Sequence, residues 1–291
     1  MFLRSLIAGL FLSVVLPARA DLPLTVEDLI TDKGKFKLDL SVAYANANRQ
    51  GVFAGEPITV QTGATSFVTL PSLVGESTGN SDTRVATFGL RYGLTSKAEI
   101  YTRLSGTHSQ QRISGAGGFA KSSDSGFADA WAGVNYQFKK DDETPAVLGF
   151  AELALREKQS NTSASFKSTM LGVTAYKAID PVVFSFTGAY RFSQHRQDGA
   201  QTVKPGNLLL LNPSVSFAVN DRVTLTTGVQ WTRRTAERID GQAQGLARTG
   251  TDLILGVGYG FDKGNTLNTS FKLNASGQGG AELRTSWLYT F

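Results

Sequence analysis

Two histidines, His108 and His195, are the only imidazole side chains in this 291-residue sequence. A lipid-modifying enzyme with a serine nucleophile would need one of them within hydrogen-bond reach of the serine, and a third group to orient the imidazole. Ser109 follows His108, but adjacent residues of a strand point to opposite faces, so these two side chains cannot pair there. We therefore predict that the protein is not an enzyme. Activity lost on replacing His108 or His195 would contradict this prediction.

Other residue patterns that could carry chemistry are weak. The glycine-rich segments 115–118 and 256–260 are not followed by a helical pattern, so neither predicts a phosphate-binding loop. No cluster of residues has the spacing of metal ligands, and we expect no metal or cofactor. The sequence has no cysteine, which excludes disulfides, thiol chemistry and a lipoprotein anchor. The small formal charge of +5 comes without a basic stripe that interleaves aromatics, so we expect no nucleic-acid partner.

The first twenty residues have the pattern of a secretory signal peptide. Arg4 gives a positive start, residues 5–16 form an apolar run, and Ala18-Arg19-Ala20 has the spacing that signal peptidase cleaves. We expect residues 1–20 to be removed and the mature chain to begin at Asp21. The apolar run is too short for a membrane-spanning helix, which needs about twenty apolar residues, and no later segment qualifies. A helical membrane protein is therefore excluded.

From Lys35 onward, apolar and polar residues alternate in about twelve runs, each roughly the 9 to 11 residues that a tilted strand needs to cross a bilayer. The sixth run, residues 165–177, is ambiguous. Met170 and Tyr176 lie on one of its faces, and Leu171 and Val173 lie on the other. We leave its facing open.

The connections between the runs differ in length in a regular way. After even-numbered runs they are short turns, and after odd-numbered runs they are longer and polar, notably over residues 48–82, 110–125 and 239–247. Aromatic residues gather near the short-turn ends, as expected of a belt at the lipid headgroups: Tyr92, Tyr136, Phe138, Tyr176, Phe184, Phe217, Tyr259, Phe261, Tyr289 and Phe291. This asymmetry is typical of an outer-membrane barrel and not of the alternative, a soluble β-sandwich.

The sequence thus predicts an all-β fold: a transmembrane antiparallel up-and-down β-barrel of about 12 strands over residues 34–291. The faces opposite the apolar ones should point inward, and the predicted pore-lining residues are Arg91, Glu99, Tyr101, Arg103, Asp129, Trp131, Glu152, Arg156, Arg191, Gln230, Arg234, Asp252, Lys272, Glu282 and Arg284. They could pack the lumen as a salt-bridge network or line a water-filled path. We favour the path, because twelve strands enclose more space than the eight that side chains alone can fill.

The two ends of the mature chain differ in their patterns of apolar and polar residues. Residues 21–33 do not alternate, and Leu24, Val26, Leu29 and Ile30 could form the apolar stripe of a short helix that plugs the barrel. A loose periplasmic tail is the alternative. The last run must pair with the first to leave no edge in lipid. Its aromatic residues Trp287, Tyr289 and Phe291 resemble the signal that bacterial barrel-assembly machinery recognises.

Three stretches together resemble a known family. They are FGLRYGLTSKAEIYTRL at residues 88–104, GFADAWAGVNYQF at residues 126–138, and the final run. They are similar to the outer-membrane barrels grouped under the meta-pathway of phenol degradation, and this resemblance implies a transporter of small, often aromatic, molecules. The segment EDLITDKGKFKLDLSVAYAN at residues 27–46 also resembles the start of the trimeric channel that exports functional-amyloid subunits, where a helical plug precedes twelve strands.

The sequence and its resemblance lead to one functional prediction. We expect a passive channel in the outer membrane for small solutes, aromatic or hydrophobic ones included, gated by the N-terminal segment. The alternatives are an export conduit for amyloid-like polypeptide subunits and a structural barrel with a closed lumen. The expected partners are outer-membrane lipid and lipopolysaccharide, the barrel-assembly machinery, and the solute or exported polypeptide. Assembly into an oligomer is left open.

Overall fold

The computed structural model describes residues 30–53, 58–63, 66–70, 75–115, 118–159, 162–262, 264–276 and 280–291. Within these ranges, no helix has the length and apolar character needed to cross a lipid bilayer. The predicted signal peptide, and Leu24, Val26 and Leu29 of the predicted plug, lie outside the described residues.

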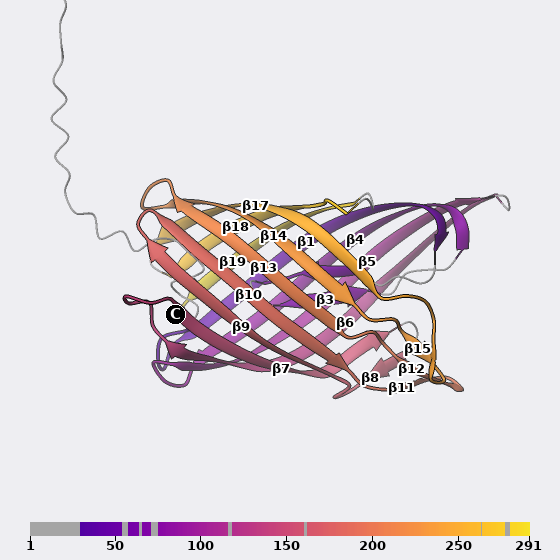
Figure 1. Ribbon diagram of the computed structural model, residues 1–291, viewed down its shortest axis with the longest axis horizontal. Helices are drawn as coiled ribbons and strands as arrows, with labels where there is room; N and C mark the ends of the chain where they lie inside the picture. Colours follow the sequence, from indigo (N-terminus) through magenta and orange to yellow (C-terminus); the bar gives the residue numbers. More distant parts are fainter. Residues whose placement is uncertain are drawn as a thin grey trace, which may run out of the picture.

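Twelve long antiparallel strands of the described chain form a closed barrel (Figure 1). They are β1 (Phe36–Phe53), β4 (Gly75–Gly93), β5 (Ala98–Gly115), β6 (Gly118–Lys139), β7 (Ala146–Gln159), β9 (Ser168–Ile179), β10 (Val182–Ser193), β13 (Leu208–Ala218), β14 (Val223–Arg234), β17 (Arg248–Asp262), β18 (Asn265–Asn274) and β19 (Gly280–Thr290). Each pairs with its neighbours along the chain, and β19 pairs with β1, so every wall strand has two partners. The predicted fold class is confirmed.

The barrel closes where its last strand, β19, pairs with its first strand, β1. The register runs from Lys37 opposite Thr290 to Ala47 opposite Gly280. Beyond it, the amide of Phe36 donates to the carbonyl oxygen of Phe291 at 3.0 Å, and the amide of Phe291 donates back at 2.9 Å. Backbone groups at this seam are thus paired where lipid could not satisfy them.

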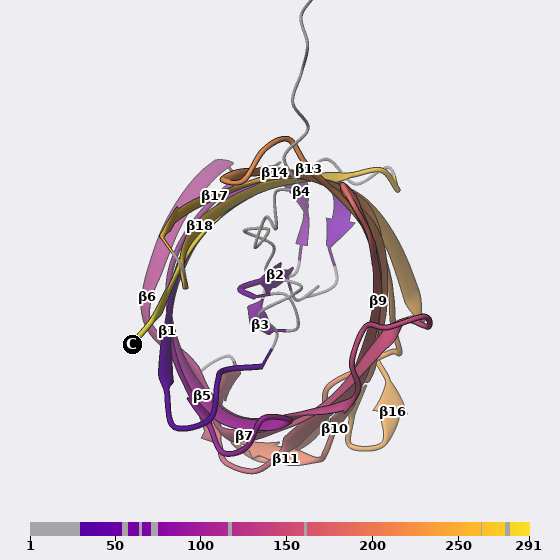
Figure 2. The same ribbon diagram turned by 90° about the vertical axis from the view of Figure 1, so that its left-hand side faces the viewer.

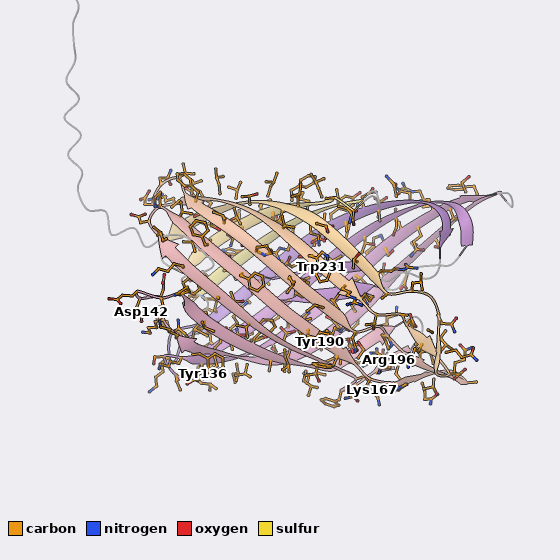
Figure 3. The ribbon with its side chains drawn as sticks, in the orientation of Figure 1. Tyr136, Asp142, Lys167, Tyr190, Arg196 and Trp231 are labelled. Atoms are coloured by element: carbon orange, nitrogen blue, oxygen red, sulfur yellow. The ribbon has the colours of Figure 1, made fainter. Side chains whose placement is uncertain are left out.

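The alternation of side chains places apolar residues on the outer face and polar residues inside. Strand β9, whose facing is ambiguous in the sequence, follows this rule. Leu171 and Val173 are each 47% exposed on the outside, whereas Met170 is 1% exposed and lies inside. Tyr176 shares the face of Met170 and is buried, so its predicted place in the aromatic belt is wrong. The other predicted belt residues lie on the outer face, as do Tyr136, Tyr190 and Trp231 in Figure 3.

Four adjacent strands make one side of the barrel taller than the other. β1, β4, β5 and β6 have 18, 19, 18 and 22 residues, well beyond the roughly 10 residues that cross the bilayer. Residues 48–53, residues 75–82 and most of residues 110–125 therefore continue the strands, and the prediction of loops at these positions was wrong. These extensions reach beyond the lipid, so their sequence is mostly polar and lacks the alternation of the crossing segments.

The end of the barrel away from these long extensions carries the short connections between strands. By the usual orientation of bacterial barrels, this is the periplasmic end. At the other, outer end, the connection between β10 and β13 and the connection between β14 and β17 form a small separate sheet over the rim. Its strands are β11 (Arg196–Asp198), β12 (Gln201–Lys204), β15 (Arg238–Ile239) and β16 (Gln242–Ala243). The short strand β8 (Thr162–Ala164) extends the wall beside β7.

A hairpin between β1 and β4 lies inside the barrel (Figure 2). Its strands are β2 (Ile58–Gln61) and β3 (Phe67–Leu70). Val60 and Val68 of the hairpin pack in one buried cluster with the wall residues Ala43, Ala45, Val85 and Ala128. These small wall side chains leave the hairpin room to approach the inner surface.

Candidate functional site

The hairpin lies between an apolar layer of the lumen and a cavity lined by hydroxyl-bearing and apolar side chains. Phe67 of β3 is 1% exposed and packs in a cluster with Trp131, Met170 and Leu210 of the wall. Burial of a phenylalanine side chain contributes roughly 1.5–3 kcal/mol, so Phe67 helps to hold the hairpin against the wall. The lumen is therefore narrowed by a segment of the chain's own first long connection.

A buried ion network lies beside this cluster on β5, β6 and β7. Arg103 forms ion pairs with Glu152 at 3.3 Å and Asp129 at 3.7 Å. The hydroxyl of Tyr101 donates to Glu152 at 2.7 Å, and the indole of Trp131 donates to Asp129 at 2.9 Å. Because each buried charge has an opposite partner, the network can persist away from bulk water.

A second cluster of buried charges shows that one predicted pore-lining residue does not face the lumen. Glu157 is buried and pairs with Arg191 and with Arg196, the latter at 3.4 Å. Ala130 lies opposite Arg156 and Trp131 opposite Ala154, so β7 has a bulge at Leu155. The extra residue reverses the facing of the next residues along the strand. Arg156 is therefore exposed on the outer face, against the Phe127 ring, and Glu157 takes the inward position.

The third cluster joins the wall to the N-terminal segment at the periplasmic end. Arg91 pairs with Glu99 at 3.2 Å and with Asp39 at 3.5 Å. Glu99 also accepts a 2.6 Å hydrogen bond from the Thr31 amide. Ile30 packs on the buried cluster of Ala146, Leu148, Tyr176 and Val183. Of the predicted plug residues, Ile30 thus lies against interior side chains, whereas a helical plug over residues 21–29 stays a prediction.

Apart from Arg156, the predicted pore-lining residues lie on the inward face of their strands. Lys272 and Glu282 pair with each other at 2.7 Å, and Asp252 accepts from Asn274 at 2.9 Å. The structure groups many of these side chains into ion-paired clusters along the wall. Whether they line the path of a solute stays a prediction.

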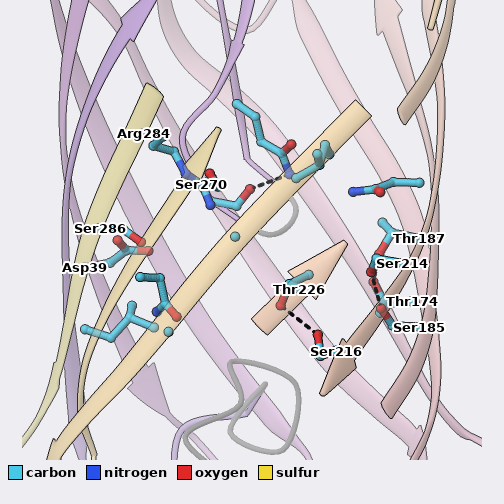
Figure 4. Close-up of a pocket in the computed structure, with 18 of the residues that line it drawn as sticks. Asp39, Thr174, Ser185, Thr187, Ser214, Ser216, Thr226, Ser270, Arg284 and Ser286 are labelled. Atoms are coloured by element: carbon cyan, nitrogen blue, oxygen red, sulfur yellow. Dashed lines mark hydrogen bonds between the residues drawn. The ribbon is translucent and has the colours of Figure 1, made fainter. Parts of the chain in front are cut away.

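Below the hairpin is a cavity of about 210 Å³. Gln61 and Gly63 of the hairpin segment line it, and the wall contributes many hydroxyl groups (Figure 4). Three pairs of these hydroxyls are hydrogen-bonded: Thr174 with Thr187 at 2.9 Å, Ser185 with Ser214 at 2.6 Å, and Ser216 with Thr226 at 2.9 Å. The cavity is large enough to hold several water molecules.

The hairpin and the inward positions of Glu157 and Arg196 were not predicted from the sequence. One signal could have revealed the hairpin. Ala43 and Ala45 lie on the inward face of β1, where small apolar residues are unexpected in an aqueous lumen. The polar connection after β1 contains the alternating segments ITVQ and FVTL, which are the two strands of the hairpin.

In the described part of the chain, neither histidine is hydrogen-bonded to a carboxylate that could orient its ring. Nδ1 of His108 lies 2.6 Å from the hydroxyl of Ser125 on the neighbouring strand, at an exposed position. The other ring nitrogen lies 3.4 Å from the amide of Gln110, which cannot stabilise an imidazolium as a carboxylate does. His195 is exposed beyond β10.

Solved structures with similar folds include a channel, a translocator domain and a porin. An outer membrane channel from Pseudomonas putida F1 is 13% identical, with 91% of this chain and 98% of that chain covered and a TM-score of 0.65. The translocator domain of the autotransporter NalP from Neisseria meningitidis is also 13% identical, with 89% of each chain covered and a TM-score of 0.54. The NanC porin is 12% identical over 87% of this chain and 98% of that chain, with a TM-score of 0.50.

Two sequence comparisons give different results. None of the curated proteins compared with the chain matches it. The model of the family described as MetA-pathway of phenol degradation matches residues 47–288, which span the barrel from within β1 to within β19. The resemblance seen in the sequence is thereby confirmed, and the chain belongs to this family of outer-membrane β-barrels.

Proposed function

We propose that the protein is a passive channel for small solutes in the bacterial outer membrane, which it reaches after cleavage of residues 1–20. The observation that carries this proposal is the cavity inside a closed barrel. A lumen that served only stability would be filled by side chains, since protein interiors are close-packed. Solutes would cross down their own concentration gradient, because no energy-coupling element is needed for a barrel to conduct.

Two segments narrow this channel. On the outer side, the Ser41 hydroxyl donates to the carbonyl oxygen of Thr62 at 3.1 Å and so ties the hairpin to β1. On the periplasmic side, Thr31 is held by Glu99, and Lys33 forms a bridge with Gly93. Displacement of either segment breaks few contacts compared with the wall itself. We infer that residues 21–33 and the hairpin both restrict passage.

The experiment is single-channel recording in planar bilayers with three versions of the protein. They are the mature chain, a deletion of residues 21–33, and a version in which residues 55–73 are replaced by a short Gly-Ser linker. We expect steady conductance in the mature chain that rises in each shortened version. If all three fold, as shown by heat-modifiable mobility, and all three are silent, the lumen is closed and the proposal is wrong.

A further inference from the structure

Most of the charged side chains that line the cavity below the hairpin are cations. Its charged lining residues in the described chain are Lys37, Arg91, Arg284 and Asp39, which are three cations and one carboxylate. Asp39 and Glu99 are engaged by Arg91. Glu282, which lies two residues before Arg284 on β19, is engaged by Lys272. Asp39 and Glu282, the carboxylates nearest to Arg284, thus each divide their charge between Arg284 and a second cation.

In the described part of the chain, several residues that line the same cavity each have a buried polar atom without a hydrogen-bond partner. These atoms are Nη1 of Arg284, Nδ2 of Asn268, Oδ1 of Asn212 and Oγ1 of Thr224. Their residues come from the strands β19, β18, β14 and β13, with only β17 between them. Buried polar groups in folded proteins are normally satisfied, so a group of unpaired atoms around one cavity indicates a place for a polar ligand.

The rest of the lining determines the kind of ligand. Ser270 lies opposite Arg284 across β18 and β19, and Figure 4 shows the two side by side at one wall of the cavity. Leu148, Phe150 and Ile254 supply apolar surface to the same cavity. A ligand that suits this lining carries a negative group at one end and a small apolar body at the other.

We infer that the cavity is a binding site for a small organic carboxylate, with Arg284 as its main anchor. The planar guanidinium can donate two parallel hydrogen bonds to a carboxylate, and Ser270 can donate another. Asn268 can donate to a further oxygen of the ligand, and Asn212 and Thr224 can accept from its hydroxyl groups. The inference rests on the proposed channel function, for which this site provides selectivity among the solutes that enter.

The test compares benzoate with benzamide, which have nearly the same shape but differ in charge. Binding to the full-length processed protein in detergent is measured by ligand-observed NMR. We expect benzoate to bind about tenfold more tightly than benzamide, the effect of one charge-assisted hydrogen bond. Equal binding of the two probes overturns the inference, and this comparison requires no variant.

Two variants assign the site to Arg284. Arg284→Gln should reduce benzoate binding to the level of benzamide, whereas Arg284→Lys should retain part of the preference. Arg233→Gln removes an exposed cation at the end of β14 and should leave binding unchanged. Unchanged benzoate binding in Arg284→Gln overturns the assignment. If Arg284→Gln does not fold, the Lys variant decides, because a site elsewhere would keep the full preference.

A separate measurement distinguishes failure of this inference from failure of the proposed function. Liposomes that contain the wild-type protein are tested for influx of arabinose, a neutral sugar. Influx without a benzoate preference leaves the channel standing and removes the carboxylate site. A benzoate preference without influx removes the channel function, on which the role in selectivity depends, and leaves only a binding cavity.

Discussion

The guanidinium of Arg103 donates a 3.2 Å hydrogen bond to the carbonyl oxygen of Phe67. Arg103 belongs to the barrel wall and Phe67 to the inserted hairpin, so this bond joins the two parts of the structure. The same guanidinium lies 5.0 Å from the ring centre of Trp131, against which the hairpin cluster packs. The hairpin is thus held by Arg103, whose side chain is itself fixed by its ion pairs with Asp129 and Glu152.

The first prediction concerns the hairpin anchor. Phe67→Ala removes a buried ring, a change that typically costs about 3–5 kcal/mol. The wall strands pair through their own backbone, so we expect a folded barrel whose hairpin docks less stably. Single-channel conductance should rise, or brief openings should become frequent.

Phe119→Ala is the matched control, because Phe119 is 70% exposed at the start of β6. It should conduct like the wild type. A folded Phe67→Ala protein with unchanged conductance would show that the hairpin does not limit passage.

Most of the wall was predictable because lipid imposes a strict rule. Every outward residue of a crossing strand must be apolar, and the period of two then fixes the facing of its neighbours. This rule identified the twelve runs and the short turns, and it placed Glu99, Arg103 and Asp129 inside. The rule ends where lipid ends, so the long polar extensions of β4, β5 and β6 did not look like strands.

The interior was harder to predict because its contacts join distant parts of the chain. Nothing local to Phe67 indicates Trp131 or Arg103 as its partners. The bulge at Leu155 was equally hidden, since Arg156 and Glu157 are both charged and either could occupy the inward position. Register shifts of this kind depend on how the neighbouring strand pairs, and this pairing cannot be read from a single sequence.

The second prediction concerns a close approach inside the wall. A Cβ at Gly133 would lie 2.5 Å from Cζ of Tyr101 and 2.9 Å from the carbonyl oxygen of Ala151. Gly133→Ala must therefore displace the Tyr101 ring and weaken its hydrogen bond to Glu152. We expect a loss of about 1–3 kcal/mol of stability, the usual cost of overpacking.

The measurement is the urea midpoint of unfolding in detergent or lipid vesicles. Gly256→Ala is the control, because the nearest atoms to its added Cβ are at 3.5 Å, an ordinary contact. Equal midpoints for Gly133→Ala and Gly256→Ala would mean that Tyr101 moves aside at no cost.

The third prediction tests the facing of β17. Val257 is 50% exposed on the outer face, between Gly256 and Gly258 of the inner face. An arginine on the lipid face near the bilayer midplane costs roughly 2–4 kcal/mol, so Val257→Arg should impair insertion into vesicles. Val257→Leu should insert normally. Equal folding yields for Val257→Arg and wild type would show that residue 257 does not face lipid.

The last prediction concerns Phe291, which pairs with Phe36 through its backbone and stacks on the Phe36 ring with centroids 5.9 Å apart. Tyr289 stacks on Phe291 at the same centroid distance, so the closing strand ends in a row of rings. Phe291→Ala keeps the backbone pairing but removes this row. We expect slower assembly into the outer membrane, seen as less heat-modifiable protein after a pulse of synthesis.

Phe138→Ala separates assembly from mere loss of apolar surface. Phe138 is 61% exposed and Phe291 is 60% exposed, and both lie on the outer face near the periplasmic end. The two variants therefore lose similar contact with lipid, but only Phe291 lies at the seam between β1 and β19. If both variants assemble at the same reduced rate, lipid contact explains the defect and Phe291 has no special role in closure. A delay confined to Phe291→Ala would locate the slow step at the pairing of the first and last strands.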